Sequence, residues 1–97
     1  MQNTLEYTAY NGMKFYIVYI EALEKEPEED SPMMSIVFTT HPEIIAEAKA
    51  DAECNGGAVP VGCKDLLVDS VDNITRQLDY VAHAVETCDP WYECLKV

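Results

Sequence analysis

The sequence predicts an α+β domain in which an antiparallel sheet of three to four strands carries two helices packed on one face. Three observations lead to this prediction. Apolar and aromatic residues cluster around an Asn-Gly pair near the start, two later segments repeat apolar residues with helical spacing, and turn or capping residues bound these segments. A chain of 97 residues has the size of one domain, so residues 1–97 are expected to share a single core.

The strands are predicted mainly in the first forty residues. Residues 5–22, LEYTAYNGMKFYIVYIEA, are typical of a β-hairpin, because Asn11-Gly12 suits a two-residue turn in which both positions need positive φ. Such a loop would pair Tyr7 with Tyr16. Its second strand is apolar on both faces, which is typical of a central strand. Residues 33–39, MMSIVFT, predict a third strand with alternate apolar residues on one face.

Two helices are predicted in the remainder of the chain. The first begins with a capping box formed by Thr40 and Glu43 and stops at Asn55-Gly56-Gly57. A short strand is expected at 64–68, before a second helix that runs from Ser70 to about Thr87. The residues that follow it, WYECLKV, are expected to pack back through Trp91 and Leu95.

The charge is the strongest functional signal in the sequence. Eighteen acidic and six basic residues give a net charge of −12. This balance argues against direct binding to DNA or RNA, which needs cations against phosphate, and against docking on anionic membranes. The expected partner is therefore a basic protein. The chain has neither an apolar run long enough to span a membrane nor a secretory signal, so we expect a cytoplasmic protein with reduced cysteines.

Signals for catalysis and metal binding are weak. The cysteine spacings are C-x8-C and C-x5-C, without the close pairs of a zinc site, and neither His41 nor His83 lies in a catalytic motif. Gly56-Gly57 lacks the Lys and Ser or Thr of a phosphate-binding loop. We therefore expect no enzyme activity, no cofactor and no metal.

Carboxylates recur in rows. Glu43, Glu47 and Asp51 are four residues apart, which places them on one helix face at intervals of ~6 Å along the axis. Phosphates of a DNA strand advance ~3.4 Å along the axis and run obliquely to it, so their spacing is comparable. On the second predicted helix, Asp72 and Asp79 share a face, with Arg76 between them. If residues 65–69 abut that helix, Asp65 and Asp69 extend this second row.

The stretch 21–32, EALEKEPEEDSP, supplies a further acidic segment. In an extended chain alternate residues lie ~6.6 Å apart on one side. The candidate partner-binding residues here are Glu21, Glu24, Glu26, Glu28, Glu29 and Asp30. Tyr7 is a further candidate, because tyrosine is favoured at protein interfaces, although a place in the core is the alternative. Solvated acidic surfaces that serve solubility alone are the ordinary alternative for all these rows.

The size, the charge and the acidic rows EALEKEPEED and EIIAEAKADAE resemble those of small acidic phage inhibitors that mimic nucleic acid. Among these, the chain looks most like the acidic anti-CRISPR proteins of type I-F systems. The resemblance implies binding to the crRNA-guided surveillance complex, in the basic groove that target DNA would enter. The alternatives are an acidic inhibitor or immunity partner of another basic protein or nuclease, of the anti-restriction type, and a small accessory protein without DNA mimicry.

Overall fold

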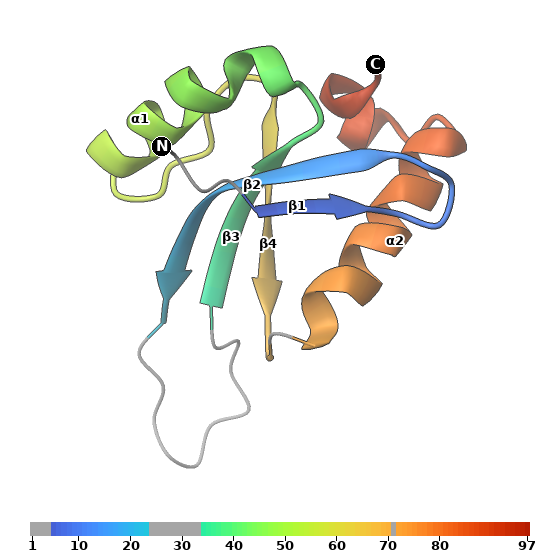
Figure 1. Ribbon diagram of the computed structural model, residues 1–97, viewed down its shortest axis with the longest axis horizontal. Helices are drawn as coiled ribbons and strands as arrows, with labels where there is room; N and C mark the ends of the chain where they lie inside the picture. The colour runs from blue at the N-terminus through green and yellow to red at the C-terminus, as the bar shows by residue number, and fades with distance from the viewer. Residues whose placement is uncertain (1–4, 24–33, 71) are drawn as a thin grey trace.

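Over the residues that the structure describes, four strands form one antiparallel sheet in the order β1-β2-β3-β4, accompanied by two α-helices and two 3₁₀ segments (Figure 1). The computed structural model describes residues 5–23, 34–70 and 72–97. The elements are β1 (Leu5–Thr8), β2 (Lys14–Ala22), β3 (Met34–Thr39), η1 (Pro42–Ile44), α1 (Ile45–Cys54), β4 (Cys63–Val68), α2 (Asp72–Glu86) and η2 (Pro90–Leu95). The α+β class, the central position of β2 and the order of the elements are confirmed.

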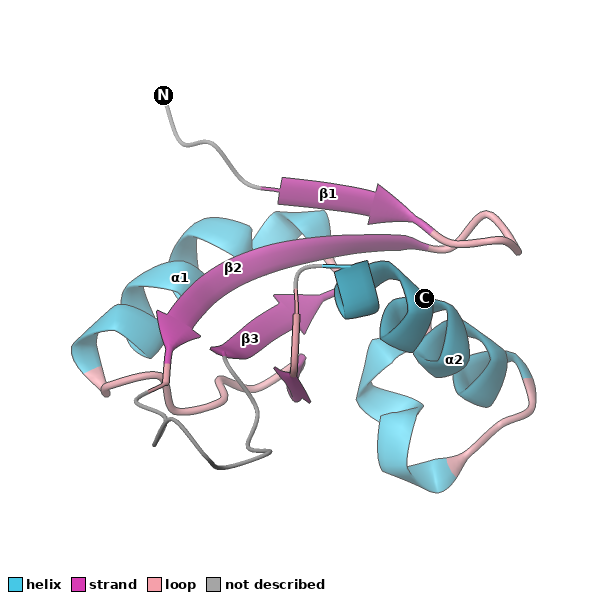
Figure 2. Ribbon diagram, turned by 90° about the horizontal axis from the view of Figure 1, so that it is seen from below, coloured by secondary structure: helices cyan, strands magenta, loops and turns pink. Residues whose placement is uncertain are grey.

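The two helices lie on opposite faces of the sheet, so the prediction that both pack on one face is wrong (Figure 2). Successive side chains of a strand point to opposite faces. In β3, Ile36 and Phe38 pack in the cluster that contains α2 residues, whereas Val37 packs in the cluster that contains Ala48 of α1. Because β2 and β3 are apolar on both faces, each face needs its own cover, and one helix supplies each.

The hairpin between β1 and β2 differs from the prediction by one residue. The Ala9 N–H donates to the Met13 carbonyl at 2.8 Å and the Gly12 N–H donates to the Ala9 carbonyl at 2.9 Å, which makes a three-residue loop with Gly12 at φ 86°. Tyr7 therefore pairs with Phe15, not with Tyr16. Asn-Gly suits both loop lengths, and a one-residue shift moves every side chain of a strand to the other face.

The start of α1 also differs from the prediction, whereas its end agrees. The Thr40 hydroxyl donates to the Leu95 carbonyl at 2.6 Å, so it forms no capping box with Glu43, and the chain enters α1 through η1. At the other end, Gly56 and Gly57 have φ values of 64° and 89°. The Gly57 N–H donates to the Ala52 carbonyl at 2.7 Å, which closes the helix as the sequence predicts.

The second helix joins the C-terminal segment to the core. Leu78, Val81 and Val85 of α2 are buried, as the helical spacing predicts. Leu95 is fully buried in the same cluster. Trp91 is 68% exposed, contrary to the expectation that it packs inward, and the Lys64 ammonium lies 4.3 Å from its ring centroid.

Replacing Gly57 by alanine is expected to destabilise the protein more than replacing Gly12. Both positions have positive φ, which costs a residue with a Cβ roughly 1–2 kcal/mol. A Cβ at Gly12 would meet nothing within 4 Å, whereas one at Gly57 would lie 3.0 Å from the Tyr19 ring and 3.2 Å from a Glu21 carboxylate oxygen. Urea unfolding of the two variants measures the loss of unfolding free energy in each. Equal losses would show that the Tyr19 and Glu21 side chains move aside for a Cβ at Gly57 without cost.

Candidate functional site

Three of the exposed carboxylates of η1 and α1 form the acidic surface whose position the structure describes most fully. Glu47 and Asp51 are exposed and stand one helical turn apart on α1, as predicted. Glu43 is exposed too, but it belongs to η1, and Ile44 (φ −103°, ψ 2°) interrupts the helix between them. The predicted straight row of three is therefore a pair on α1 with a third carboxylate on the preceding turn. We call these three residues the α1 acidic surface.

The way α1 packs explains why this surface is broad. The buried residues of α1 are Ala48 and Ala52, with Ile44 and Ile45 partly buried at its start. A contact made through alanine side chains is narrow, so most of the helix circumference faces solvent. The carboxylates there are consequently not needed for packing.

Of the predicted residues in the acidic stretch 21–32, the described part of the chain includes Glu21. It is exposed near the end of β2, and its carboxylate lies close to Gly57, just beyond α1. Glu21 therefore adjoins the end of α1. The other candidates, Glu24, Glu26, Glu28, Glu29 and Asp30, lie outside the described residues.

Ion pairing does little to neutralise the described carboxylates. Over residues 5–23, 34–70 and 72–97, the contacts within 4.0 Å are Lys14 with Glu6 at 3.6 Å and His41 Nδ1 with Glu43 at 3.8 Å. The second of these is an ion pair only when His41 is protonated. In this part of the chain Glu47 and Asp51 are without a basic partner at that distance, so their negative charge remains available to a binding partner.

Tyr7 has an internal role in the structure. It is partly buried and packs against the core cluster, and its hydroxyl donates to Asp79 Oδ1 at 3.0 Å. The Tyr10 N–H donates to the same oxygen at 3.2 Å. Burial raises the pKa of Tyr7, and the Asp79 carboxylate raises it further, so the phenol stays a donor. Asp79, predicted as part of a second acidic row, thus fastens the hairpin to α2.

Replacing Tyr7 by phenylalanine is expected to lower the free energy of unfolding more than the same change at Tyr10. Tyr7 donates to Asp79 in a partly buried setting, whereas Tyr10 is exposed and its hydroxyl lies 3.2 Å from both His83 Nδ1 and Glu86 Oε2. Urea unfolding of the two variants compares the losses. If Tyr7→Phe is the milder change, the Tyr7–Asp79 bond does not hold the hairpin.

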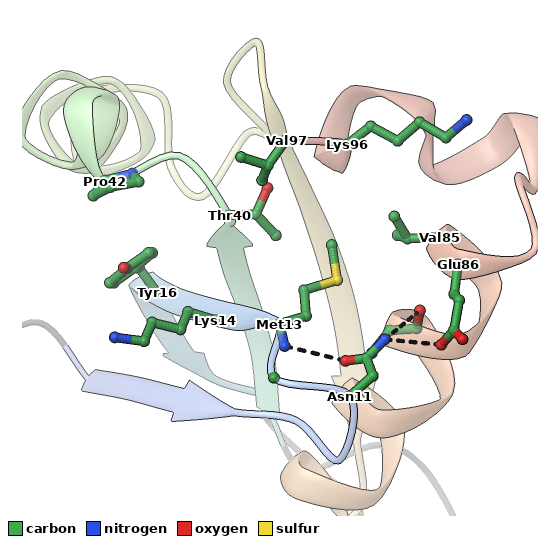
Figure 3. A pocket seen from close by; sticks show the side chains of 12 residues that line it. Asn11, Met13, Lys14, Tyr16, Thr40, Pro42, Val85, Glu86, Lys96 and Val97 are labelled. Atoms are coloured by element: carbon green, nitrogen blue, oxygen red, sulfur yellow. Dashed lines mark hydrogen bonds between the residues drawn. The ribbon is translucent and has the colours of Figure 1, made fainter.

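An open groove of about 790 Å³, which the sequence did not indicate, lies on the described part of the chain (Figure 3). The groove lies between the hairpin loop and the end of α2, and it is also lined by Thr40, Pro42, Lys96 and Val97. Its polar groups are largely engaged: Asn11 donates to Glu86 at 3.1 Å, and Thr40 to Leu95. The Lys14 and Lys96 side chains extend away from one another at its two sides. The groove brings no nucleophile and base together.

Each histidine contacts a segment that is distant in the sequence. His41 Nε2 lies 2.8 Å from the Cys94 carbonyl, and His83 Nδ1 lies 3.2 Å from the Tyr10 hydroxyl. Among the residues that the structure describes, no three His, Cys, Asp or Glu side chains are placed to hold one metal ion. Nor does the described part of the chain contain a helix with the length and apolarity to cross a membrane.

Comparison with known proteins adds no relative. No protein-family model matches the chain, and neither the curated proteins nor the solved structures show a significant match to it.

Proposed function

We propose that this protein inhibits a bacterial nucleic-acid-targeting defence complex by presenting carboxylates in place of DNA phosphates. The observation that carries the proposal is the α1 acidic surface, whose Glu47 and Asp51 are exposed and, among the described residues, face no lysine or arginine within 4.0 Å. The net charge of −12 gives the whole molecule the sign that a basic DNA-binding groove attracts.

The mechanism is competitive exclusion of DNA. Carboxylates of the α1 acidic surface contact the lysine and arginine side chains that otherwise hold phosphates, and the bound protein occupies the groove. Complementary potentials accelerate the encounter and set the orientation of the complex. Glu47 and Asp51 belong to a helix, so the spacing of their backbone positions exists before binding. The entropic cost of ordering a loop on association is therefore avoided.

The partner that we propose is the type I-F crRNA-guided surveillance complex in the cytoplasm of the bacterial host, as an anti-CRISPR protein would require. The protein acts by occupancy in this account, so it needs neither catalytic residues nor a cofactor. An inhibitor of another basic protein or nuclease would need the same surface and a different partner, and the experiment below separates the two.

Capture from a lysate tests the proposal. The immobilised protein is exposed to lysate of a bacterium with a type I-F system, and retained proteins are eluted with rising salt. We expect the surveillance complex to elute as salt screens the charge contacts. Retention of an unrelated basic nuclease would favour the anti-restriction alternative. If no protein is retained at low salt, the proposal is wrong and the negative charge serves only solubility.

A further inference from the structure

Two cysteines that are distant in the sequence meet at the beginning of β4. Cys63 is the first residue of that strand and Cys94 belongs to η2, and the Cys94 Sγ lies 3.8 Å from the Cys63 carbonyl oxygen. Two hydrogen bonds fix η2 in this position. His41 Nε2 lies 2.8 Å from the Cys94 carbonyl, and the Thr40 hydroxyl donates to the next carbonyl, that of Leu95, at 2.6 Å. Cys94 is therefore held against β4 rather than approaching it by chance.

The two thiols differ in accessibility. Cys94 is exposed, whereas Cys63 is 4% exposed and packs with Val18 and Val37 beneath α1. Burial raises the pKa of the Cys63 thiol, a hydrogen bond with Thr39 opposes this, and the nearby Cys94 adds to the rise. An accessible thiol beside a protected one is the arrangement in which the first thiol reacts with an oxidant and the second resolves the product.

We propose that Cys63 and Cys94 form a reversible oxidative cross-link when the protein meets a low-molecular-weight disulfide such as oxidised glutathione. The Cys94 thiolate attacks one sulfur of the oxidant, forms a mixed disulfide and releases one glutathione thiolate. Cys63, after losing its proton to solvent, attacks Cys94 Sγ and releases the second glutathione thiolate. The two released thiolates take up two protons, so the protein loses two electrons and two protons and the oxidant becomes two reduced glutathione molecules.

The cross-link ties η2 to an edge strand of the sheet. The segment just beyond η2 contributes Lys96 and Val97 to the groove, so oxidation fixes one wall of that hollow. It also closes the chain between β4 and η2, a long loop whose closure disfavours the unfolded state. This modification site is independent of the proposed inhibition, because neither cysteine belongs to the α1 acidic surface.

Oxidation of the reduced protein with oxidised glutathione tests the site. Free thiols are blocked after a timed reaction and the linked peptides are identified by mass spectrometry. We expect one intramolecular bond between Cys63 and Cys94, formed faster as pH rises, because more of the Cys63 thiol is then ionised. A bond between any other pair as the main product, or Cys94 that keeps glutathione in the unaltered chain, would overturn the proposal.

Two variants distinguish the roles of the two thiols. Cys63→Ser is expected to stop at the glutathione adduct on Cys94, because the resolving thiol is missing, and Cys94→Ser is expected to abolish the cross-link. The double change of Cys54 and Cys88 to serine is the matched control, since both are exposed free thiols outside the site. Loss of the cross-link in that control would show that a different cysteine pair carries the reaction.

Discussion

Changing Glu43, Glu47 and Asp51 together to lysine is expected to weaken binding to the basic partner by ~100-fold or more, equivalent to about 2.7 kcal/mol. The three new ammonium groups would face the cations that the carboxylates contact in our proposal, and like charges at an interface cost several kcal/mol. The fold should persist, because these side chains are exposed and α1 is held through Ala48 and Ala52. Affinity is measured by biolayer interferometry, and circular dichroism checks the fold.

The matched control changes the same amount of charge elsewhere on the molecule. Asp65, Asp69 and Glu93 are exposed and belong to β4, the segment after it and η2. Their triple replacement by lysine alters the net charge equally, so it should reduce only the long-range attraction and cost far less affinity. If both triple variants lose affinity equally, the partner senses net charge and not the α1 acidic surface.

Replacing Phe38 by alanine is expected to lower the free energy of unfolding by ~3–5 kcal/mol. Phe38 is fully buried on β3, and its ring meets that of Phe15 edge-on, with 5.6 Å between the ring centroids. The change removes a large apolar side chain and this aromatic contact from the cluster that holds α2. For a domain of this size such a loss is a large part of the total stability.

Urea unfolding followed by circular dichroism measures this effect. Leu67→Ala is the control, since Leu67 is more than half exposed on the edge strand β4. That variant should stay within about 0.5 kcal/mol of the unaltered protein, as exposed substitutions usually do. A comparable loss in both variants would mean that the sheet, not the cluster around Phe38, limits stability.

The features of the fold that depend on local sequence patterns, namely the strands, the helices and their order, could be predicted from the sequence. The apolar runs of β2 and β3, the spacing in α2 and the glycine stop after α1 identified the elements and their order. β2 is apolar on both faces, and this pattern agrees with the helix that packs on each face of the sheet. The faces that helices occupy depend on the whole sheet, and one strand read alone does not specify them.

The errors arose where distant residues compete for the same groups. Thr40 could have capped α1, but the Leu95 carbonyl, far along the chain, takes its hydroxyl hydrogen. The local sequence around Tyr7 likewise does not mark its hydrogen bond to Asp79 of α2. The exposure of Glu47 and Asp51 was foreseeable from helical spacing, whereas the groove and the meeting of Cys63 with Cys94 depend on tertiary contacts that no local motif marks.

Competition on a purified type I-F surveillance complex tests whether this protein excludes DNA from the complex. The affinity of the complex for duplex target DNA is titrated at several fixed concentrations of this protein. We expect the apparent dissociation constant for DNA to rise linearly with the concentration of free protein, from its value without the protein, while the DNA bound at saturation stays unchanged. DNA affinity that stays constant in the presence of bound protein would contradict the account, because the two ligands would then occupy the complex together.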